Sequence, residues 1–557
     1  TEYGYFAGLT KSQSNKVIML DVPYLYLKTN QDYDFNGSTI LATGAYDFAN
    51  TQRWYSQYPY GSGVFMNDAS LYGVASDSTD GSMYGVEIGY YGSPITKIVA
   101  NNTVFSNVAK IEATNGYKYY TNYIWEIEEF SITNSSISHF QGYQELNNAI
   151  QYTDICLVLG GGDGAVVSDN TFNDCGVGVM LQRSAYYNYH TADEWGADNA
   201  TISNNVFNDG GEIADIWLYS NGYSDDAVIT GNTINSANAA VAAIGVYNGK
   251  HTRMTISDNI INAGTDGIYV SNGVDYHITG NTINGGGDAA YAGMSLVGGY
   301  GDVDNNTLVD ADGGLIVDSA SAPPAPTTSL CTIGRYSYSY GPVTCNVNLA
   351  AGKTMTVNIE TDSWGYEASI TLLKPDGTTQ SWPTWTFNSN SEYTLGTYSD
   401  SGNYTLTLRD TFGDGGTNVF MVEGGSAGGY DGPTIADNSI SSSPGRTAPA
   451  AVGLVFEDCA SVSINSARNT VTLSDNAMVI SNCDLSDEDS VLQGQGDTTT
   501  VGLDADDPNG DLLTLSGTTI TGFATGVEKT SGEITLTGDA SISGADYGVY
   551  VDDATVV

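Results

Sequence analysis

A short phrase, apolar-x-x-Asn-x-apolar, recurs along this chain and limits what the chain can fold into. Residues 277–319 contain it twice, as HITGNTI and DVDNNTL, and each copy is followed by a glycine-rich bend and another short apolar strand. From Asn170 onward, the asparagines of successive copies are 35, 27, 27, 22 and 25 residues apart. A period of roughly 20–30 residues made of short strands and turns is typical of a solenoid, because one repeat cannot bury its apolar side chains alone.

The asparagine of each copy is expected to lie where the chain turns between two strands. Asn tolerates a left-handed backbone there, and its amide can bond the asparagines of the coils above and below. Coils stacked at about 4.8 Å would then share one core. A copy at Asn102 also fits the phrase, and the predicted asparagine ladder consists of Asn170, Asn205, Asn232, Asn259, Asn281, Asn306, Asn438 and Asn476.

This repeat resembles that of the right-handed parallel β-helix in the pectate-lyase-like superfamily. The resemblance covers most of residues 94–320 and 429–557. It implies a right-handed parallel β-helix; together with the change of pattern described next, we expect an all-β fold in which this β-helix is interrupted by an inserted β-sandwich domain. Residues 1–93 are rich in tyrosine but do not fit the repeat, so we expect irregular first coils or a cap of the β-helix there.

The pattern changes between residues 321 and 428. A proline-rich exit, SAPPAPTTS, is followed by longer alternating strands such as KTMTVNIETD and GNYTLTLRD, which predict an inserted β-sandwich. These phrases resemble a CUB-like module of secreted microbial proteins, in which acidic residues at loop ends commonly hold calcium. The resemblance implies a calcium site made from Asp362, Glu367, Asp410 and Asp414, although solvated turn residues would look the same.

The six cysteines form three couples that are local in the sequence. Cys156/Cys175, Cys331/Cys345 and Cys459/Cys483 are separated by 19, 14 and 24 residues, and no C-x-x-C motif occurs. We therefore predict three disulfides and an extracellular location. Six N-x-S/T sequons are compatible with a glycosylated surface: Asn36, Asn101, Asn134, Asn199, Asn305 and Asn403. The sequence begins at Thr1 without Met, so we expect a mature or trimmed form.

The charge is one-sided, with 64 Asp+Glu against 17 Lys+Arg and a net charge of −47. This balance excludes nucleic acid as a partner, because phosphate binding needs a basic face. It would also repel anionic lipid and anionic polysaccharide unless a metal ion bridged them. No stretch approaches the roughly 18–20 continuous apolar residues of a membrane span.

The sequence contains few residues that would indicate an enzyme. The β-helix fold hosts polysaccharide lyases and hydrolases, but the chain has only seven arginines and four histidines. The adjacent carboxylates Asp225 and Asp226 are explained by a turn. The long loop 181–200 is the strongest candidate for a contact site, either with protein or with glycan, through Arg183, Tyr186, Tyr187, His190 and Trp195, which lie beside Asp193 and Glu194.

These observations favour a structural protein without enzymatic activity. We expect a subunit of a microbial surface assembly, of archaeal type, such as a filament, sheath or surface layer, which self-associates through tyrosine-rich surfaces. The alternatives are a secreted polysaccharide lyase or hydrolase of the β-helix superfamily, and an adhesin that presents the sandwich as its binding head. Calcium and glycans are the ligands that these readings imply.

Overall fold

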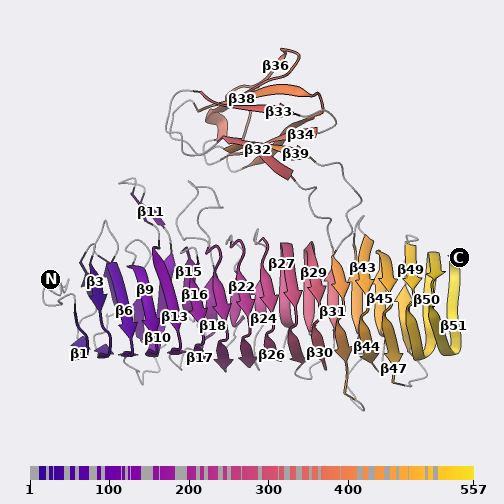
Figure 1. Cartoon of the computed structure of the whole chain (residues 1–557), viewed down its shortest axis with the longest axis horizontal. Coiled ribbons are helices and arrows are strands. Elements are labelled where there is room, and N and C mark those ends of the chain that lie inside the picture. Colours follow the sequence, from indigo (N-terminus) through magenta and orange to yellow (C-terminus); the bar gives the residue numbers. More distant parts are fainter. Residues whose placement is uncertain are drawn as a thin grey trace. The chain divides into compact units, whose positions relative to one another are not determined.

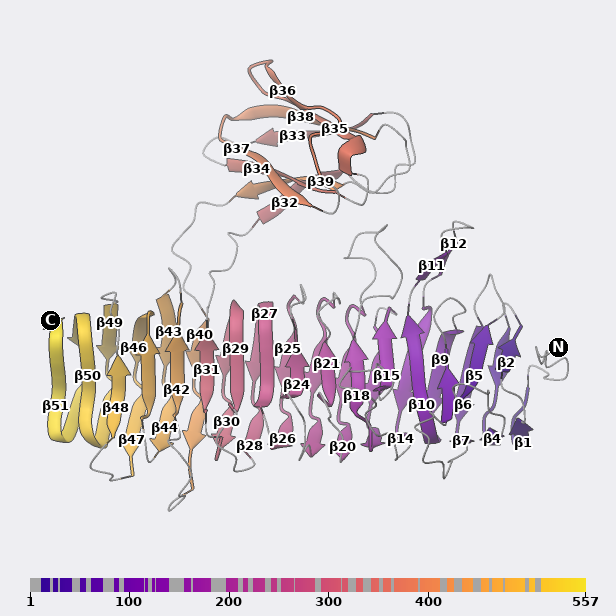
Figure 2. The ribbon, with the colours of Figure 1, turned by 180° about the vertical axis from the view of Figure 1, so that it is seen from behind.

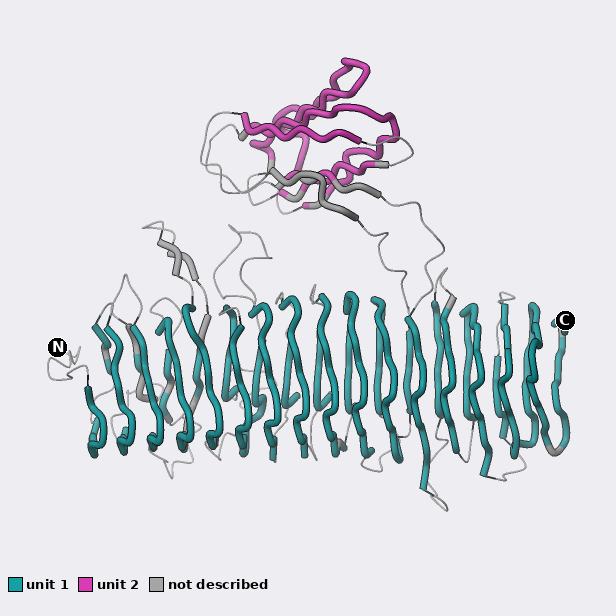
Figure 3. Tube along the Cα trace, viewed as in Figure 1, with its two compact units in different colours: residues 1–185, 195–322, 431–557 teal, residues 186–194, 323–430 magenta. Residues whose placement is uncertain are grey.

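The chain divides into two compact units, each described here by itself (Figure 3). A computed structural model of the 557-residue chain describes residues 12–20, 24–28, 31–42, 51–56, 62–73, 85–89, 95–114, 116–118, 123–125, 127–139, 155–161, 164–181, 197–208, 214–218, 224–235, 242–247, 252–264, 266–285, 292–311, 313–318, 327–333, 342–349, 354–361, 365–388, 391–410, 418–424, 433–443, 452–459, 463–473, 476–495, 500–505 and 512–557.

The first unit is a parallel β-helix. Each coil contributes one strand to each of three stacks, which we call sheets 1, 2 and 3, and strands from neighbouring coils pair in parallel (Figures 1 and 2). This pattern includes the described strands before residue 94, which belong to the same three sheets. The all-β parallel architecture expected from the repeat is therefore present.

Sheet 1 is the first sheet of each coil. It contains β3 (Asp32–Asp34), β6 (Ser62–Asn67), β9 (Ile95–Asn101), β13 (Glu129–Thr133), β16 (Val166–Ser168), β19 (Thr201–Ser203), β22 (Val228–Thr230), β25 (Thr255–Ser257), the ends of β27 (Asp266–Thr279) and β29 (Met294–Asp304), β40 (Thr434–Ala436), β43 (Ser463–Ala467), β46 (Asp484–Glu488), β49 (Leu512–Ser516), and the ends of β50 (Thr519–Thr537) and β51 (Ser541–Val556).

Sheet 2 follows sheet 1 across a tight turn. It contains β1 (Val17–Leu20), β4 (Thr39–Ala42), β7 (Ser70–Gly73), the start of β10 (Val104–Thr114), β14 (Ser136–His139), β17 (Thr171–Asn173), β20 (Val206–Asn208), β23 (Thr233–Asn235), β26 (Ile260–Ala263), β28 (Thr282–Gly285), β30 (Thr307–Val309), β41 (Ser439–Ser441), β44 (Thr470–Leu473), β47 (Val491–Gly494), and the starts of β50 and β51.

Sheet 3 closes each coil. It contains β2 (Tyr24–Leu27), β5 (Thr51–Ser56), β8 (Gly85–Ile88), the end of β10, β15 (Ile155–Gly160), β18 (Val177–Leu181), β21 (Ile216–Leu218), β24 (Ala242–Val246), the starts of β27 and β29, β31 (Leu315–Asp318), β42 (Leu454–Glu457), β45 (Met478–Ser481), β48 (Val501–Ala505), and the middle parts of β50 and β51. A separate antiparallel hairpin, β11 (Gly116–Lys118) and β12 (Tyr123–Trp125), follows β10.

One continuous apolar core runs along the inside of the three sheets. In sheet 2 each short strand points its central side chain inward, as with Phe172 and Phe207, whose rings stack with centroids 4.7 Å apart. The residues on either side of this central position point outward because successive side chains of a strand alternate between its two faces. The alternation explains why three-residue strands such as TFN and VFN suffice for a coil.

A two-residue turn joins sheet 1 to sheet 2 in every coil from β6–β7 to β49–β50. Its first residue has a left-handed backbone in all thirteen of these coils: Asp68, Asn102, Asn134, Asp169, Asn204, Gly231, Asp258, Gly280, Asn305, Asp437, Arg468, Asp489 and Gly517. Its second residue is buried and is most often asparagine. The left-handed conformation therefore belongs to the residue before each ladder asparagine, which corrects the sequence expectation. Asn102 takes this first position, and Thr103 follows it inward.

The buried second residues form a hydrogen-bonded row. The Nδ2 of each asparagine donates to the Oδ1 of the next, at 2.9–3.1 Å, through Asn170, Asn205, Asn232, Asn259, Asn281, Asn306, Asn438 and Asn469. The row continues directly from Asn306 to Asn438, although 132 residues separate them. Insertion of the second unit therefore leaves the ladder uninterrupted.

The predicted final member, Asn476, does not belong to this row. Asn469 takes its place and donates to Ser466 Oγ at 3.0 Å, whereas Asn476 Oδ1 accepts from the backbone N–H of Val501. The sequence phrase missed Asn469 because a buried Ser466 stands where the phrase requires an apolar residue. Asn476 fitted the phrase by chance.

The described residues of the second unit lie within 323–430, where the sequence predicted an insert over 321–428. Two antiparallel sheets form it: β32 (Thr327–Ile333), β39 (Asn418–Gly424), β34 (Thr354–Glu360) and β37 (Glu392–Tyr398) in one, and β33 (Val343–Leu349), β38 (Gly402–Asp410), β35 (Ala368–Leu373) and β36 (Thr379–Trp382) in the other. They share an apolar core that includes Met355, Ile370 and Leu406.

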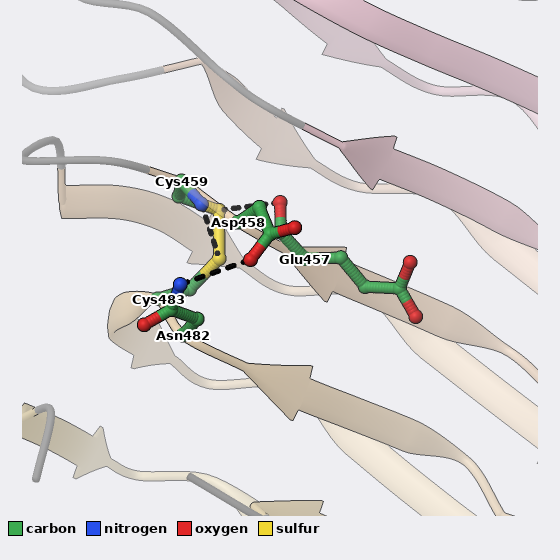
Figure 4. Close-up of a disulfide and its surroundings, with 5 residues drawn as sticks. All are labelled: Glu457, Asp458, Cys459, Asn482 and Cys483. Carbon is green, nitrogen blue, oxygen red and sulfur yellow. Dashed lines mark hydrogen bonds between the residues drawn. A yellow bond between two sulfur atoms is a disulfide. The ribbon is translucent and has the colours of Figure 1, made fainter. Parts of the chain in front are cut away.

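Two disulfides join neighbouring coils. Cys156–Cys175 lies at the start of sheet 3, and Cys459–Cys483 lies just after it (Figure 4). Beside the second bridge, Asn482 Nδ2 donates to Asp458 Oδ1 at 2.9 Å and ties the same two coils together. The predicted partner of Cys345 is Cys331, whose side chain lies outside the described residues.

Candidate functional site

A tryptophan on the second unit is unusually exposed and has an unusual backbone. Trp385 lies in the turn between β36 and β37, with 77% of its surface accessible and a φ of 69°. A left-handed backbone costs an L-residue about 1–2 kcal/mol, and bulky residues rarely adopt it. Such strain in a turn is a signal of a functional residue.

The indole of Trp385 is held in place by Tyr366. The two rings stack with centroids 4.6 Å apart and an interplanar angle of 14°, and the Trp385 backbone N–H donates to Tyr366 O at 2.7 Å. Tyr366 belongs to a 3₁₀ turn, Gly365–Glu367, that leads directly into β35. The Tyr366 ring is therefore positioned by the start of a core strand, and the Trp385 ring stacked on it is exposed to solvent.

This pair forms an aromatic platform, which we define as Trp385 with Tyr366. A flat exposed ring buries a large apolar area against a ligand while losing little conformational freedom. Glu367 follows Tyr366 directly in the chain and is half-buried, so the sequence next to the platform also supplies a carboxylate. Sugar-binding sites combine these two elements, because the ring contacts the apolar face of a pyranose and polar groups bond its hydroxyls.

The β-helix has a second candidate site on sheet 3. The turn between sheets 1 and 2 contains only two residues in thirteen successive coils. The longer connections are therefore those that enter and leave sheet 3, and they lie at its two edges. The candidate contact loop 181–200 follows β18 at one of these edges. Insertions of a solenoid that gather along one face commonly mark its binding face.

Aromatic side chains line the outer face of sheet 3. The ring of Tyr247 stacks on Tyr269 at 4.9 Å and meets Trp217 edge-on at 6.1 Å. A Cβ on Gly245 would lie 2.6 Å from the Tyr247 ring, so glycine is needed there to let the ring lie over β24. The Tyr247 hydroxyl is buried and has no hydrogen-bond partner among the described residues. Its burial leaves no room for a ligand to contact it directly.

Two carboxyl groups at the start of sheet 3 strands have altered acidity. Burial raises the pKa of Asp215, which is 1% exposed, to about 7. Burial also raises the pKa of Asp266 to about 6, although its Oδ1 accepts a hydrogen bond from the Ala292 N–H. Burial, with the nearby charges of Tyr269 and Asp266, raises the pKa of Tyr247. Asp266 therefore belongs to the surroundings of the aromatic row.

The adjacent carboxylates Asp225 and Asp226 have a structural role. Arg253, from the next coil, donates from Nε and Nη2 to the two carboxylate oxygens of Asp226 at 2.8 Å, and Nη2 also reaches Asp225 at 3.2 Å. The hydrogen bond to Arg253 lowers the pKa of Asp226. This pair therefore links two coils through Arg253, a contact that the expectation of a solvated turn did not include.

Several predicted site residues lie outside the described residues. These are the contact-loop residues Arg183, Tyr186, Tyr187, His190 and Trp195, the calcium candidates Asp362 and Asp414, and the side chain of Asp410. Only Glu367 of the calcium set is placed, and the described part of the chain contains no cluster of three or more metal-ligating side chains. The calcium site stays a prediction.

The six sequons are all placed. Asn36 is half-buried, whereas Asn101, Asn134, Asn199, Asn305 and Asn403 are exposed. Their exposure is compatible with glycosylation and does not test it.

Sequence reasoning missed the platform. Trp385 lies in the segment SWPTWTF, where an aromatic residue beside Pro383 marks a turn, but the pairing with Tyr366 depends on strand register. It also missed Tyr247 and Tyr269, which lie in different coils.

Comparisons with known proteins found remote likenesses only. No family model matches the chain, and no curated protein matches it. Among solved structures, a PL6 alginate lyase in complex with a trisaccharide has 12% identity and a TM-score of 0.26, with 82% of this chain and 79% of that chain covered. The Dettilon tailspike protein has the same identity and TM-score, with 73% and 86% covered.

A third similar structure is a tailspike from Acinetobacter baumannii bacteriophage Fri1, a capsular polysaccharide depolymerase, with 9% identity, a TM-score of 0.23, and 74% and 86% covered. At these identities and scores, what those proteins act on does not transfer to this chain. Within the described residues, no helix is long and apolar enough to pass through a lipid bilayer.

Proposed function

We propose that this chain is an extracellular glycan-binding protein, an adhesin in which a β-helix carries an inserted β-sandwich as its binding head. The observation that carries the proposal is Trp385, an exposed indole with a strained backbone, stacked on Tyr366. Disulfides between neighbouring coils support an oxidising compartment. The aromatic side chains Trp217 and Tyr247 on sheet 3 are packed in a buried cluster, so Trp385 is the exposed ring that carries the proposal.

The ligand is proposed to be a neutral glycan. A net charge of −47 disfavours anionic polysaccharides over distances of about a Debye length, roughly 8–10 Å at physiological salt. Aromatic stacking needs no charge on the sugar. Binding is proposed to occur without cleavage, so the role is recognition rather than depolymerisation.

The test is binding of the full chain to arrayed neutral and anionic glycans, with three variants. Trp385→Ala removes the exposed indole ring. Because one stacking contact contributes about 1.5 kcal/mol, this change is expected to weaken binding about tenfold or more. Trp385→Phe should retain most of the affinity. Tyr547→Ala, which removes another exposed aromatic ring from the β-helix, is the matched control and should bind as the parent does.

A fourth variant separates binding from folding. Trp385→Gly relieves the left-handed backbone but also removes the ring stack, and these opposite effects are each on the order of 1 kcal/mol. Stability should therefore change little while binding is lost. Unchanged glycan binding by both the alanine and glycine variants would refute the proposal, and release of reducing ends or unsaturated uronates would show an enzyme instead.

A further inference from the structure

Among the described residues, the two outward columns of sheet 2 carry no charged side chain, although the chain has a net charge of −47. The strands are β1, β4, β7, β10, β14, β17, β20, β23, β26, β28, β30, β41, β44, β47, β50 and β51, sixteen in all. One outward column consists of Val17, Thr39, Ser70, Val104, Ser136, Thr171, Val206, Thr233, Ile260, Thr282, Thr307, Ser439, Thr470, Val491, Thr519 and Ser541. Every member is Thr, Ser, Val or Ile.

The second outward column is also neutral. It consists of Met19, Leu41, Tyr72, Ser106, Ser138, Asn173, Asn208, Asn235, Asn262, Asn284, Val309, Ser441, Thr472, Gln493, Thr521 and Ser543. None of the residues in either column is buried. Apolar members are well exposed, with Ile260 at 47% and Val491 at 39%.

Part of this face is ordered by its own hydrogen bonds. The amide of each asparagine from Asn208 to Asn284 donates to the Oδ1 of the asparagine in the preceding coil, at 2.9–3.2 Å. This second, external ladder runs opposite in direction to the buried one. β-Branched side chains in the first column have one strongly restricted torsion. The face therefore loses little side-chain freedom when it is covered.

Sheet 1 provides the contrast. Its outward residues include Lys97, Glu129, His277, Asp302 and Glu488, so hydroxyl-bearing side chains there are interspersed with charges. Of the thirteen turn residues along the edge that joins sheets 1 and 2, five are aspartates and one is Arg468, which pairs with Asp437. The neutral face thus has an acidic rim, and the charges are placed beside it rather than on it.

We propose that sheet 2 is the interface between two copies of this chain, which pair side by side. A second copy fits because its coils repeat at the same spacing, about 4.8 Å, so side chains can interdigitate along the whole face. Sixteen strands at that spacing and about 10 Å of width present roughly 700 Å² per copy, close to the approximately 800 Å² per partner of a standard interface. A contact of one face with itself closes as a dimer.

Pairing through this face has an expected dependence on salt. The two acidic rims approach each other in the dimer, so their repulsion opposes association and is screened as ionic strength rises. The dissociation constant should fall when salt is raised from about 0.02 M to about 0.5 M, because the Debye length shortens from about 20 Å to about 4 Å. An interface made of ion pairs would respond in the opposite direction.

The test is sedimentation velocity of the full chain over a range of concentrations and salt. The triple variant Thr233→Asp, Thr282→Asp and Thr307→Asp places charges on the face and should raise the dimer dissociation constant at least about a hundredfold. The matched control is Thr201→Asp, Thr255→Asp and Thr514→Asp, which makes the same replacements on strands of sheet 1. The control should dimerise as the parent does.

Three results would overturn the proposal. These are a parent chain that stays monomeric at every salt concentration, a control variant that dissociates as much as the sheet 2 variant, and a dimer that weakens as salt rises. Circular dichroism of both triple variants checks that the strands remain folded. Glycan binding by Trp385 is independent of this interface, so either proposal can fail alone.

Discussion

Replacing Asn232 tests how much the buried ladder stabilises the β-helix. Its side chain is fully buried and takes part in four hydrogen bonds: Nδ2 donates to Ile202 O and Asn259 Oδ1, and Oδ1 accepts from the backbone N–H and the Nδ2 of Asn205, all at 2.9–3.0 Å. Asn232→Ala removes all four and leaves partners in two neighbouring coils buried without them. At about 1 kcal/mol for each bond, the expected loss is about 4 kcal/mol.

Asn235 offers a matched control in the same coil. Its amide makes two equivalent bonds, to Asn208 and from Asn262, but on the solvent-accessible face of sheet 2. In the dissociated chain, water can replace these bonds, so at a protein concentration below the dimer dissociation constant Asn235→Ala should lose no more than about 1 kcal/mol. Asn232→Ser should fall between the two alanine variants, since the ladder itself uses Ser490, whose Oγ accepts the N–H of Asn469.

The assay is urea unfolding combined with amide hydrogen exchange on the full chain. Exchange is needed because a solenoid with a separate inserted unit need not unfold in one step. Protection should fall most at Asn205, Ile202 and the strands beside them. Equal destabilisation by Asn232→Ala and Asn235→Ala would refute the reasoning. It would mean that neither burial nor the larger number of hydrogen bonds of Asn232 adds to the stability of the β-helix.

Three further outcomes are expected. The pKa of Asp215 is raised from 3.8 to about 7, so its carboxyl binds a proton more tightly in the folded chain; stability contributed by this group is present below about pH 4 and lost as pH rises through 7. Asp215→Asn should therefore stabilise the chain by up to about 4 kcal/mol more at pH 8 than at pH 4, and a pH-independent effect would exclude this account. Peptide mapping without reductant should recover Cys156–Cys175 and Cys459–Cys483, and replacing either pair by serine should cost about 3 kcal/mol in unfolding experiments; recovery of free thiols would contradict both bridges. If the acidic loops of the sandwich bind calcium, the sandwich transition of the full chain should be about 2.7 kcal/mol more stable at a hundredfold excess over Kd than in chelator, and identical melting curves would eliminate the site.

The sequence by itself determined the architecture, since the period and the phrase around each asparagine are local features. A coil must repeat its inward residues to continue one core, so the repeat is visible wherever the coil is short and regular. The near-coil separations of Cys156/Cys175 and Cys459/Cys483 likewise predicted bridges between neighbouring coils. The change from the repeat to longer alternating strands marked the insert, because sandwich strands follow a different period.

Only the tertiary structure decided which residues meet. Asn469 rather than Asn476 extends the ladder because hydrogen-bond register, not the local phrase, selects the member of each coil. The neutral face of sheet 2 draws two residues from each of sixteen coils, whose lengths vary, so no window of the sequence contains it. Trp385 and Tyr366 are joined by the pairing of β35 with β36. Surfaces of a solenoid are assembled across coils, and a one-dimensional pattern fixes only what lies within one coil.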